Sequence, residues 1–281
     1  MLEDDLRGQV LGDHFRLLEQ LGEGGQSTVY RAADLSGGAD VAVKVMKGSV
    51  AEDPNARERM SREAQVLMNL VRTPASIRLF GQYWTKDGRL CLAMELLDGH
   101  DLDHELGASG GTMDAHRLHR LLPPVIETLE AAHRQGVVHR DLKPGNLYLT
   151  KQAPHVRLLD FGFAKFMRLR SFTEDGFVAG SPSYIPPEAW AGLADLDARA
   201  DVYSMAALMF RALTGEVPFP CSSLLDLHGK VQRAPRPKLT QRRPQLPKKL
   251  DAWAELALAS NRDERFQNIS ALWKAFEEAL S

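Results

Sequence analysis

The chain has 281 residues, 44% of them hydrophobic and 26% charged, a composition typical of globular proteins and unlike that of fibrous or disordered ones. Lys and Arg number 35 and Asp and Glu 37, so the net charge of −2 favours neither nucleic acid nor an anionic membrane as a partner. The acidic start, the lack of an apolar run of ~20 residues and the two distant cysteines predict a cytoplasmic chain, or the cytoplasmic part of a longer receptor, without membrane contact of its own.

The first 95 residues predict a small antiparallel sheet with one helix. Runs of β-prone residues separated by Gly-rich turns indicate five strands. They cover residues 15–21, 27–34, 40–46, 77–83 and 90–95. Between the third and fourth strands, Asp53 followed by Pro54 can cap a helix of about four turns, which the apolar spacing from Met60 to Val71 supports.

The rest of the chain predicts mainly helices, which makes the fold class α+β. Leu118 to His133 has the apolar spacing of one amphipathic helix, and residues 202–213 are apolar on nearly every face, as in a buried central helix. Residues 233–249 carry seven basic residues and no acidic one, which predicts an extended connector. Two last helices are expected at residues 250–259 and 269–280.

Gly22, Gly24 and Gly25 lie in a turn between the first two predicted strands. Glycine has no Cβ, so such a turn lets backbone N–H groups approach a polyphosphate. Its position between two strands excludes the dinucleotide-binding fold and the P-loop, which hold phosphate at a helix N-terminus. By itself the turn is better explained as a plain hairpin, so its meaning depends on motifs further along the chain.

Those motifs are present in a fixed order. Lys44 ends the apolar strand sequence Val-Ala-Val-Lys, and Glu63 follows on the predicted helix. The run His-Arg-Asp-Leu-Lys-Pro-Gly-Asn covers residues 139–146, and Asp-Phe-Gly covers residues 160–162. Together they resemble the signature of the eukaryotic-type (Hanks-type) protein kinases, and among these the bacterial serine/threonine kinases.

This resemblance covers residues 15–280 and implies a bilobal, protein-kinase-like fold. A small antiparallel β-sheet lobe with one helix would span residues 15–94, and a hinge would span residues 95–101. A larger, mainly helical lobe would span residues 102–281, with residues 1–14 as an N-terminal extension.

The resemblance also assigns the catalytic groups. Phosphoryl transfer needs positioning and charge neutralisation more than covalent help. Asp141 would accept the proton of the substrate hydroxyl, with Lys143 beside the transferred phosphate. Lys44, oriented by Glu63, would hold the α- and β-phosphates of ATP. The metal ligands would be Asn146 and Asp160, which suit Mg²⁺ or, as an alternative, Mn²⁺.

The nucleotide-binding residues follow from the same resemblance. The backbone of Glu95 and Leu97 would bind the adenine edge behind the gatekeeper Met94. Gly22, Gly24 and Gly25 would form the glycine turn over the phosphates. The roof of the adenine pocket would be formed by Leu21, Val29 and Ala42, its floor by Tyr148, and the ribose acceptor would be Asp101. Tyr148 is larger than the aliphatic or Met side chain expected there, and Asp101 is also explained as the start of a helix.

The segment from Asp160 to Glu188 resembles an activation segment. Thr173 is the first candidate for phosphorylation, Ser171 the second and Ser181 a further one, because Arg140 next to the catalytic aspartate is the feature linked to control by loop phosphate. By resemblance, Glu188 pairs with Arg265, and Asp201 holds the backbone of the catalytic loop. Gly145 and Arg211 replace glutamates that bind substrate arginines in many relatives, which disfavours a preference for upstream arginine.

The expected function is therefore ATP-dependent phosphorylation of Ser and Thr in protein substrates, including the chain's own activation segment, with a homodimer as the arrangement for autophosphorylation. Two alternatives stay open. A pseudokinase would keep the fold as a binding module, although it would usually lack one of Lys44, Asp141 or Asp160. A small-molecule kinase is opposed by Lys143, Glu188 and Arg265.

Overall fold

The structure, a computed structural model, describes residues 5–24, 27–47, 73–153, 155–160, 182–191 and 196–281. These residues form two compact units. Unit 1 contains the chain up to residue 72 and residues 77–98, and unit 2 contains residues 73–76 and 99–281. Glu63 with its predicted helix, Gly25, and the predicted phosphorylation sites Ser171, Thr173 and Ser181 lie outside the described residues. No helix in the described ranges is both long and apolar enough to cross a membrane.

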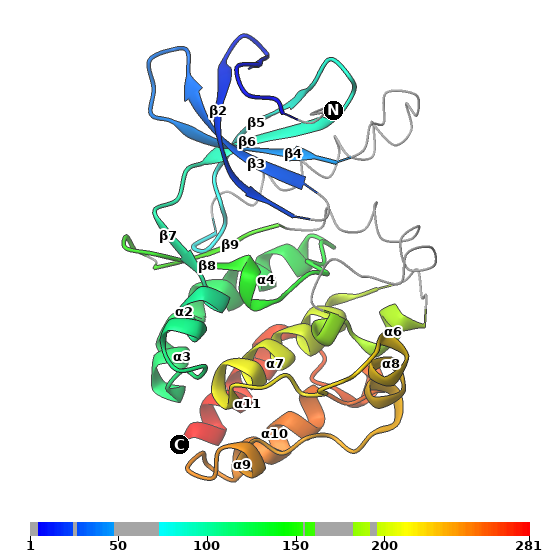
Figure 1. The fold of residues 1–281 in the computed structure, drawn as a ribbon. Helices are drawn as coiled ribbons and strands as arrows, with labels where there is room; N and C mark the ends of the chain where they lie inside the picture. Colours follow the sequence, from blue (N-terminus) through cyan, green and yellow to red (C-terminus); the bar gives the residue numbers. More distant parts are fainter. Residues whose placement is uncertain (1–4, 25–26, 48–72, 154, 161–181, 192–195) are drawn as a thin grey trace. The chain divides into compact units, whose positions relative to one another are not determined.

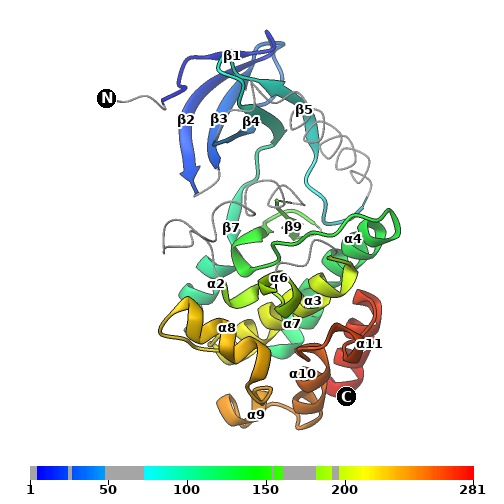
Figure 2. The same cartoon turned by 90° about the vertical axis from the view of Figure 1, so that its right-hand side faces the viewer.

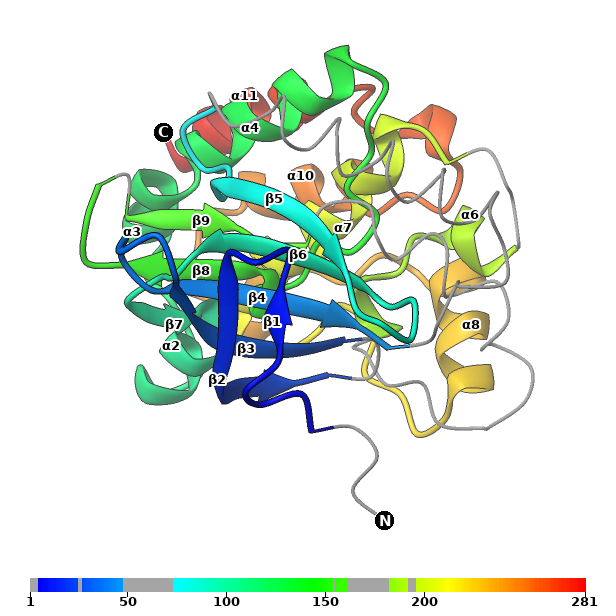
Figure 3. The same ribbon diagram turned by 90° about the horizontal axis from the view of Figure 1, so that it is seen from above.

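Unit 1 is a six-stranded antiparallel sheet with the order β1-β2-β3-β4-β6-β5 (Figure 3). Its strands are β1 (Val10–Leu11), β2 (Phe15–Glu23), β3 (Ser27–Asp34), β4 (Val41–Met46), β5 (Leu79–Trp84) and β6 (Leu90–Glu95). All five predicted strands are present. Strand β4 is buried along its whole length because it lies inside the sheet, between β3 and β6.

The first residues of the chain are part of this sheet's packing. Strand β1 pairs with β2, and Leu6 and Leu11 belong to the buried core of unit 1. The ring of Phe15 meets the edge of the Tyr83 ring at a centroid distance of 5.5 Å. Gly12 lies against the same Tyr83 ring, where a Cβ would overlap ring carbons. The described part of the predicted extension therefore packs onto the sheet.

Unit 2 combines a three-stranded sheet with helices (Figures 1 and 2). The sheet has the order β7 (Gly99–Asp101), β8 (Leu147–Thr150) and β9 (Val156–Leu158). The α-helices are α2 (Leu102–Ala108), α3 (Ala115–Leu121), α4 (Pro123–Arg134), α6 (Pro187–Trp190), α7 (Ala198–Thr214), α8 (Leu224–Arg233), α9 (Leu239–Arg242), α10 (Lys249–Ala257) and α11 (Ile269–Leu280). Short 3₁₀ turns cover Pro144–Asn146, Pro182–Tyr184 and Arg262–Glu264.

Helix α7 forms the centre of unit 2, as the sequence predicts. Fourteen of its residues are buried, and most of these are apolar, so the helix is apolar on nearly every face. The Asp197 carboxylate accepts the N–H of Arg199 at the N-terminus, and Gly215 ends the helix in the left-handed conformation that favours glycine. The predicted helix at residues 269–280 is present with the same bounds, and the one predicted at residues 250–259 is α10.

The single helix predicted from Leu118 to His133 is wrong: the structure has two helices, α3 and α4, separated at Leu122. The apolar period is correct, since Leu118, Leu122, Val125 and Leu129 are all buried. The break occurs because Pro123 and Pro124 have no N–H to donate to the preceding turn. Proline is well tolerated in the first turn of a helix, so α4 begins there.

The extended connector predicted at residues 233–249 is also corrected. It contains the short helix α9, and two of its arginines bind carbonyl oxygens. Arg236 donates to the carbonyls of Val231 and Leu258 over 3.1 and 2.8 Å and to that of Ala234, and it stacks on the Phe219 ring. Arg243 donates over 2.8 Å to the carbonyl of Met113. Two of the seven basic residues in this stretch therefore satisfy backbone carbonyl groups.

We expect Arg236→Ala to lower the free energy of unfolding by about 2–3 kcal/mol, because several carbonyls would lose a charged donor and Phe219 its stacking partner. The exposed neighbour Arg233 provides the matched control, and Arg233→Ala should leave stability unchanged within error. Urea unfolding followed by tryptophan fluorescence measures both variants. Equal effects of the two substitutions would contradict the role assigned to Arg236.

Candidate active site

Three side chains that the sequence predicts for the site meet in the loop between α4 and β8. Lys143 Nζ lies 2.8 Å from Asp141 Oδ2, and Asn146 Nδ2 lies 3.1 Å from the same oxygen. Asn146 Nδ2 also donates to the Asp141 backbone carbonyl over 2.7 Å. Asn146 is buried, whereas Asp141 and Lys143 are partly accessible to solvent. The arrangement holds a carboxylate at the surface in a fixed orientation, beside a cation.

The residues before Asp160 are tied to this loop through the backbone. Leu159 N–H donates to the Asn146 carbonyl over 2.8 Å, and the buried His139 ring bonds the Leu159 carbonyl through Nε2, also over 2.8 Å. Asp160 follows with a φ of +61°, in the left-handed region that few non-glycine residues adopt. The residue before Asp160 is therefore held by the loop that contains Asp141 and Asn146, which fixes where the backbone of Asp160 starts.

The predicted metal site can be tested by asking which atoms of the Asn146 side chain are available to a cation. Its amide nitrogen donates two hydrogen bonds to Asp141, and its Oδ1 makes no hydrogen bond within the described residues. Carboxylate and amide oxygens are the ligands that Mg²⁺ prefers. Asn146 and Asp160 thus fit a hard divalent cation, which would neutralise phosphate charge when bound.

A buried carboxylate at the start of α7 holds the loop that contains Asp141. Asp201 is fully buried, and its two oxygens accept the backbone N–H groups of His139 and Arg140 over 2.7 and 2.8 Å. The contact predicted for Asp201 is therefore present. Arg140 has a φ of +68°, which costs a non-glycine residue about 1–2 kcal/mol. The two hydrogen bonds that Asp201 accepts offset this strain and keep the loop in place.

Sequence reasoning missed the third partner of this carboxylate, His133 on α4. Its Nε2 lies 2.7 Å from Asp201 Oδ2, and both side chains are almost inaccessible to solvent. Burial opposes the charge of Asp201, but the hydrogen bond from His133 and the neighbouring imidazoles and amides hold the pKa of the carboxyl below its usual value. His133 lies at a position of the apolar period, so the sequence alone indicated a packing residue and not a polar contact.

Burial also lowers the pKa of His139 below its usual value near 6.5. The unfolded chain then binds a proton that the folded chain does not, so the stability from keeping His139 neutral is fully present above pH ~6.5 and is lost as the pH falls. We expect the free energy of unfolding to decrease as the pH falls from about 7 to 5, with a slope of at most ~1.4 kcal/mol per pH unit from this group.

His139→Asn should flatten that slope, because it removes the titrating ring. His155→Asn serves as the control, since His155 is exposed and has a φ of +65°, a conformation that asparagine tolerates. Urea unfolding at several pH values gives the slope for each variant. A slope unchanged by His139→Asn would show that another group takes up the proton.

The predicted nucleotide-binding residues of unit 1 share one face of its sheet. Lys44 is 8% exposed and lies directly opposite Val29 of β3. Ala42, two residues away on β4, lies directly opposite Met94 of β6. Since directly paired residues and residues two apart in a strand point to the same side, these four side chains lie together. The pairing of Lys44 with Glu63 stays a prediction.

The glycine turn closes between β2 and β3. Gly24 N–H donates to the Ser27 carbonyl over 2.8 Å, and Gly22 pairs with Val29 at the end of β2. A Cβ at Gly22 would meet no atom within 4 Å, so its own unit requires no glycine there. Leu21, at 49% exposed, is among the large apolar side chains that unit 1 leaves at its surface. The open space around these residues suits the approach of a ligand to the backbone.

After β6, the backbone N–H that the sequence predicts to bind adenine, that of Leu97, is available to a ligand as far as the described residues show. Glu95 N–H donates to the Arg78 carbonyl over 2.9 Å, whereas the N–H of Leu97 makes no hydrogen bond within the described residues.

In unit 2, Asp101 caps the N-terminus of α2. Its Oδ1 accepts the N–H of His104 over 2.8 Å, and its Oδ2 has no partner among the described residues. The helix-start explanation of Asp101 is thus correct, and one carboxylate oxygen still remains for a hydroxyl group.

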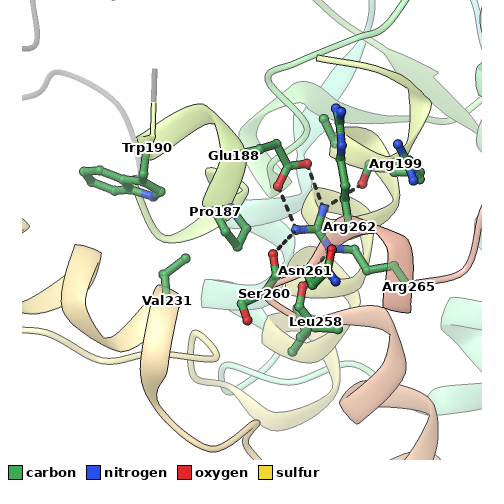
Figure 4. A network of polar contacts seen from close by, with 12 residues as sticks. Pro187, Glu188, Trp190, Arg199, Val231, Leu258, Ser260, Asn261, Arg262 and Arg265 are labelled. Atoms are coloured by element: carbon green, nitrogen blue, oxygen red, sulfur yellow. Dashed lines mark hydrogen bonds and ion pairs between the residues drawn. The ribbon is translucent and has the colours of Figure 1, made fainter. Parts of the chain in front are cut away.

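The predicted ion pair between Glu188 and Arg265 is present and buried. Figure 4 shows the two side chains facing each other, with contacts of 2.8 and 2.7 Å between guanidinium nitrogens and carboxylate oxygens. Arg265 also donates to the carbonyls of Ala259, Ser260 and Arg199 over 2.7, 3.0 and 3.1 Å. This pair joins the segment after residue 182 to the residues before α11.

Sequence reasoning also missed a carboxylate beside the catalytic loop, Asp103 on α2. A Cβ at Gly145 would lie 3.4 Å from Asp103 Oδ2, an ordinary van der Waals contact, so the Asp103 carboxylate lies directly beside this position. Burial and the nearby Asp101 raise the pKa of Asp103 above its usual value. An acidic group is therefore next to position 145, although the residue at 145 itself is glycine.

Comparison with known sequences gives one family over nearly the whole chain. The protein kinase domain matches residues 15–276. The chain is 33% identical over 279 residues to serine/threonine-protein kinase PknH of Mycobacterium tuberculosis, covering 99% of the chain and 44% of PknH. It is 34% identical over 283 residues to serine/threonine-protein kinase Pkn1 of Myxococcus xanthus, covering 99% and 40%. The chain spans less than half the length of these curated relatives.

The solved structures give the same result for the fold. The crystal structure of the PknI kinase domain of Mycobacterium tuberculosis superposes with a TM-score of 0.74 at 28% identity, covering 97% of this chain and 98% of the other. A crystal structure of a single-residue mutant of that domain gives a TM-score of 0.76 at 27% identity and covers 98% of both chains.

Proposed function

Because the chain belongs to the protein kinase family, among the bacterial serine/threonine kinases, we propose that it transfers the γ-phosphoryl group of ATP to Ser and Thr hydroxyls of proteins. The observation that carries the proposal is the cluster of Asp141, Lys143 and Asn146 around one carboxylate oxygen. A pseudokinase would usually lack one of Lys44, Asp141 or Asp160, and the sequence contains all three.

Each residue contributes one task to the transfer. Asp141 accepts the proton of the substrate hydroxyl, and its hydrogen bonds with Lys143 and Asn146 fix the direction in which the carboxylate points. Lys143 offsets the charge of the transferred phosphate, and Lys44 that of the α- and β-phosphates. Asn146 and Asp160 would hold the Mg²⁺ ion, which supplies the remaining charge neutralisation when bound.

We also propose that the activation segment controls this site. Arg140 is strained, adjacent to Asp141 and held by Asp201, and its Nε is buried without a hydrogen-bond partner in the described part of the chain. A phosphate on Thr173 or Ser171 would supply acceptors for its guanidinium. Autophosphorylation within a homodimer is the route that we propose for adding this phosphate.

The test starts from phosphatase-treated protein incubated with Mg-ATP and a generic protein substrate, followed by mass spectrometry of phosphorylated sites. We expect phosphate on Ser and Thr, with Thr173 or Ser171 among the modified positions, and complete loss when EDTA removes the metal. If ATP binds and neither the chain nor the substrate gains phosphate, the pseudokinase alternative is favoured. If only small hydroxyl compounds are modified, the protein-substrate assignment is wrong.

A further inference from the structure

The Asp103 carboxylate lies beside the loop that contains Asp141. Asp103 is in the first turn of α2, and a Cβ at Gly145 would lie 3.4 Å from its Oδ2. Two residues before Gly145, Lys143 places its Nζ 2.8 Å from Asp141 Oδ2. One extended residue spans ~3.3–3.6 Å, so a peptide whose hydroxyl reaches Asp141 can place a neighbouring side chain at Asp103. The Asp103 side chain is accessible to solvent and so to such a peptide.

No cation of the described residues forms an ion pair with this carboxylate. The charges of Arg211 and Lys143 act on it only from a distance, and burial of part of the side chain outweighs them, which raises the pKa of Asp103 above its usual value. Lys143 pairs instead with Asp141, and the Arg211 guanidinium donates over 2.8 Å to the Gly111 carbonyl. The negative charge of Asp103 is therefore weakly compensated by the described residues, and a cation that reached it directly would stabilise it.

The buried side chain of Tyr184, three residues before α6, belongs to the same group. Burial raises the pKa of its hydroxyl and the charge of Asp103 raises it further, whereas the charge of Arg211 lowers it. The hydroxyl makes no hydrogen bond to any of the described residues. A carboxylate, a guanidinium and a hydroxyl therefore lie near one another beside Gly145 without bonding to one another. Such a group has donors and acceptors left for a polar side chain of a ligand.

We propose that Asp103 binds a basic side chain, Lys or Arg, close in sequence to the Ser or Thr that is phosphorylated. This inference rests on the proposed function. Although position 145 is glycine, α2 brings an acidic group to the same place, so a preference for basic substrates does not depend on the residue at 145. An acidic substrate side chain is the alternative, since Arg211 would attract it. Arg211 already donates to a carbonyl, whereas Asp103 contacts no cation of the described residues, so the basic side chain is favoured.

The test uses peptides built on a site that the protein phosphorylates in the generic substrate, with Lys, norleucine or Glu placed in turn at each neighbouring position. Norleucine matches the lysine side chain without its charge. We expect kcat/KM of wild type to be about three- to fivefold higher for Lys than for norleucine at one position. Asp103→Asn should reduce this ratio to about one and leave KM for ATP within about twofold of wild type. Asparagine keeps an oxygen for the Gly145 N–H and loses only the charge.

Asp263→Asn is the matched control, because it removes one exposed carboxylate from the same unit and should leave the ratio unchanged. Arg211→Gln removes the competing cation and should raise the ratio about twofold, which tests the proposal even if Asp103→Asn does not fold. Wild type that phosphorylates neither protein nor peptide would contradict the proposed function itself. If wild type is active, the role of Asp103 is overturned when Lys and norleucine peptides react equally, when Glu is preferred, or when Asp103→Asn and Asp263→Asn give the same ratio.

Discussion

Asp141→Asn is expected to lower kcat for phosphoryl transfer roughly 100- to 10,000-fold, with affinity for Mg-ADP within about twofold of wild type. An amide cannot accept the hydroxyl proton at neutral pH. The substitution removes the negative charge of the carboxylate that accepts hydrogen bonds from Lys143 and Asn146 at Oδ2. It leaves both of those donors in place. The loss should therefore appear in the chemical step and not in nucleotide binding.

Steady-state kinetics with a generic protein substrate, together with calorimetry of Mg-ADP, measure the two quantities separately. Asp263→Asn is the control, since Asp263 is 74% exposed and contacts Arg199 at the surface. Its kcat should match that of wild type. If Asp141→Asn retains activity within about tenfold of wild type, Asp141 does not accept the proton, and the assignment of the site is wrong.

Breaking the pair between Glu188 and Arg265 should give the largest change in stability. The two side chains are 5% and 0% exposed, and removing one partner of a buried pair costs about 3–5 kcal/mol because the other charge stays buried. We expect Arg265→Met to cost more than Glu188→Gln. Arg265 also satisfies three backbone carbonyls and lies over the Tyr203 ring at 5.0 Å, and methionine replaces none of these contacts.

Urea unfolding of the two single variants and of the double variant completes a cycle. Because each single change leaves an unpaired buried partner, the double variant should cost clearly less than the sum of the single ones. Tryptophan fluorescence reports mainly on unit 2, which contains Trp190, Trp253 and Trp273. Should Arg265→Met fail to fold, Glu188→Gln alone still tests the prediction against Asp263→Asn, which should change stability little. Additive costs would show that the two side chains do not act as a pair.

Much of the fold could be predicted because the relevant signals are local. The strands of unit 1 and the buried helix α7 follow from side-chain periods within one segment, and their bounds agree closely with the structure. The order of the motifs around Lys44, Asp141 and Asp160 was sufficient to indicate the family, since each motif is a short run of adjacent residues. The assignment of individual site residues to ATP and metal stays a prediction.

The error in the helix predicted from Leu118 to His133 has a local cause: the apolar period predicts one helix, and the two prolines that divide it lie within the segment and act through missing N–H donors. Other features were determined by contacts between residues far apart in the sequence. The same period hides the contact of His133 with Asp201, which lies 68 residues away. A side chain's position on a helix face does not reveal which buried polar group another element brings to it.

By itself the sequence determined the family, the strands of unit 1, the central helix and the residues expected to carry the chemistry, because all of these are encoded in adjacent or periodic residues. Only the tertiary structure decided that Arg236 and Arg243 bind backbone carbonyls, that Asp103 lies beside Gly145, and that the Tyr148 hydroxyl donates to the Gly99 carbonyl. The reason is that hydrogen bonds to backbone carbonyls, and the absence of a Cβ where two strands meet, depend on which distant backbone comes within reach.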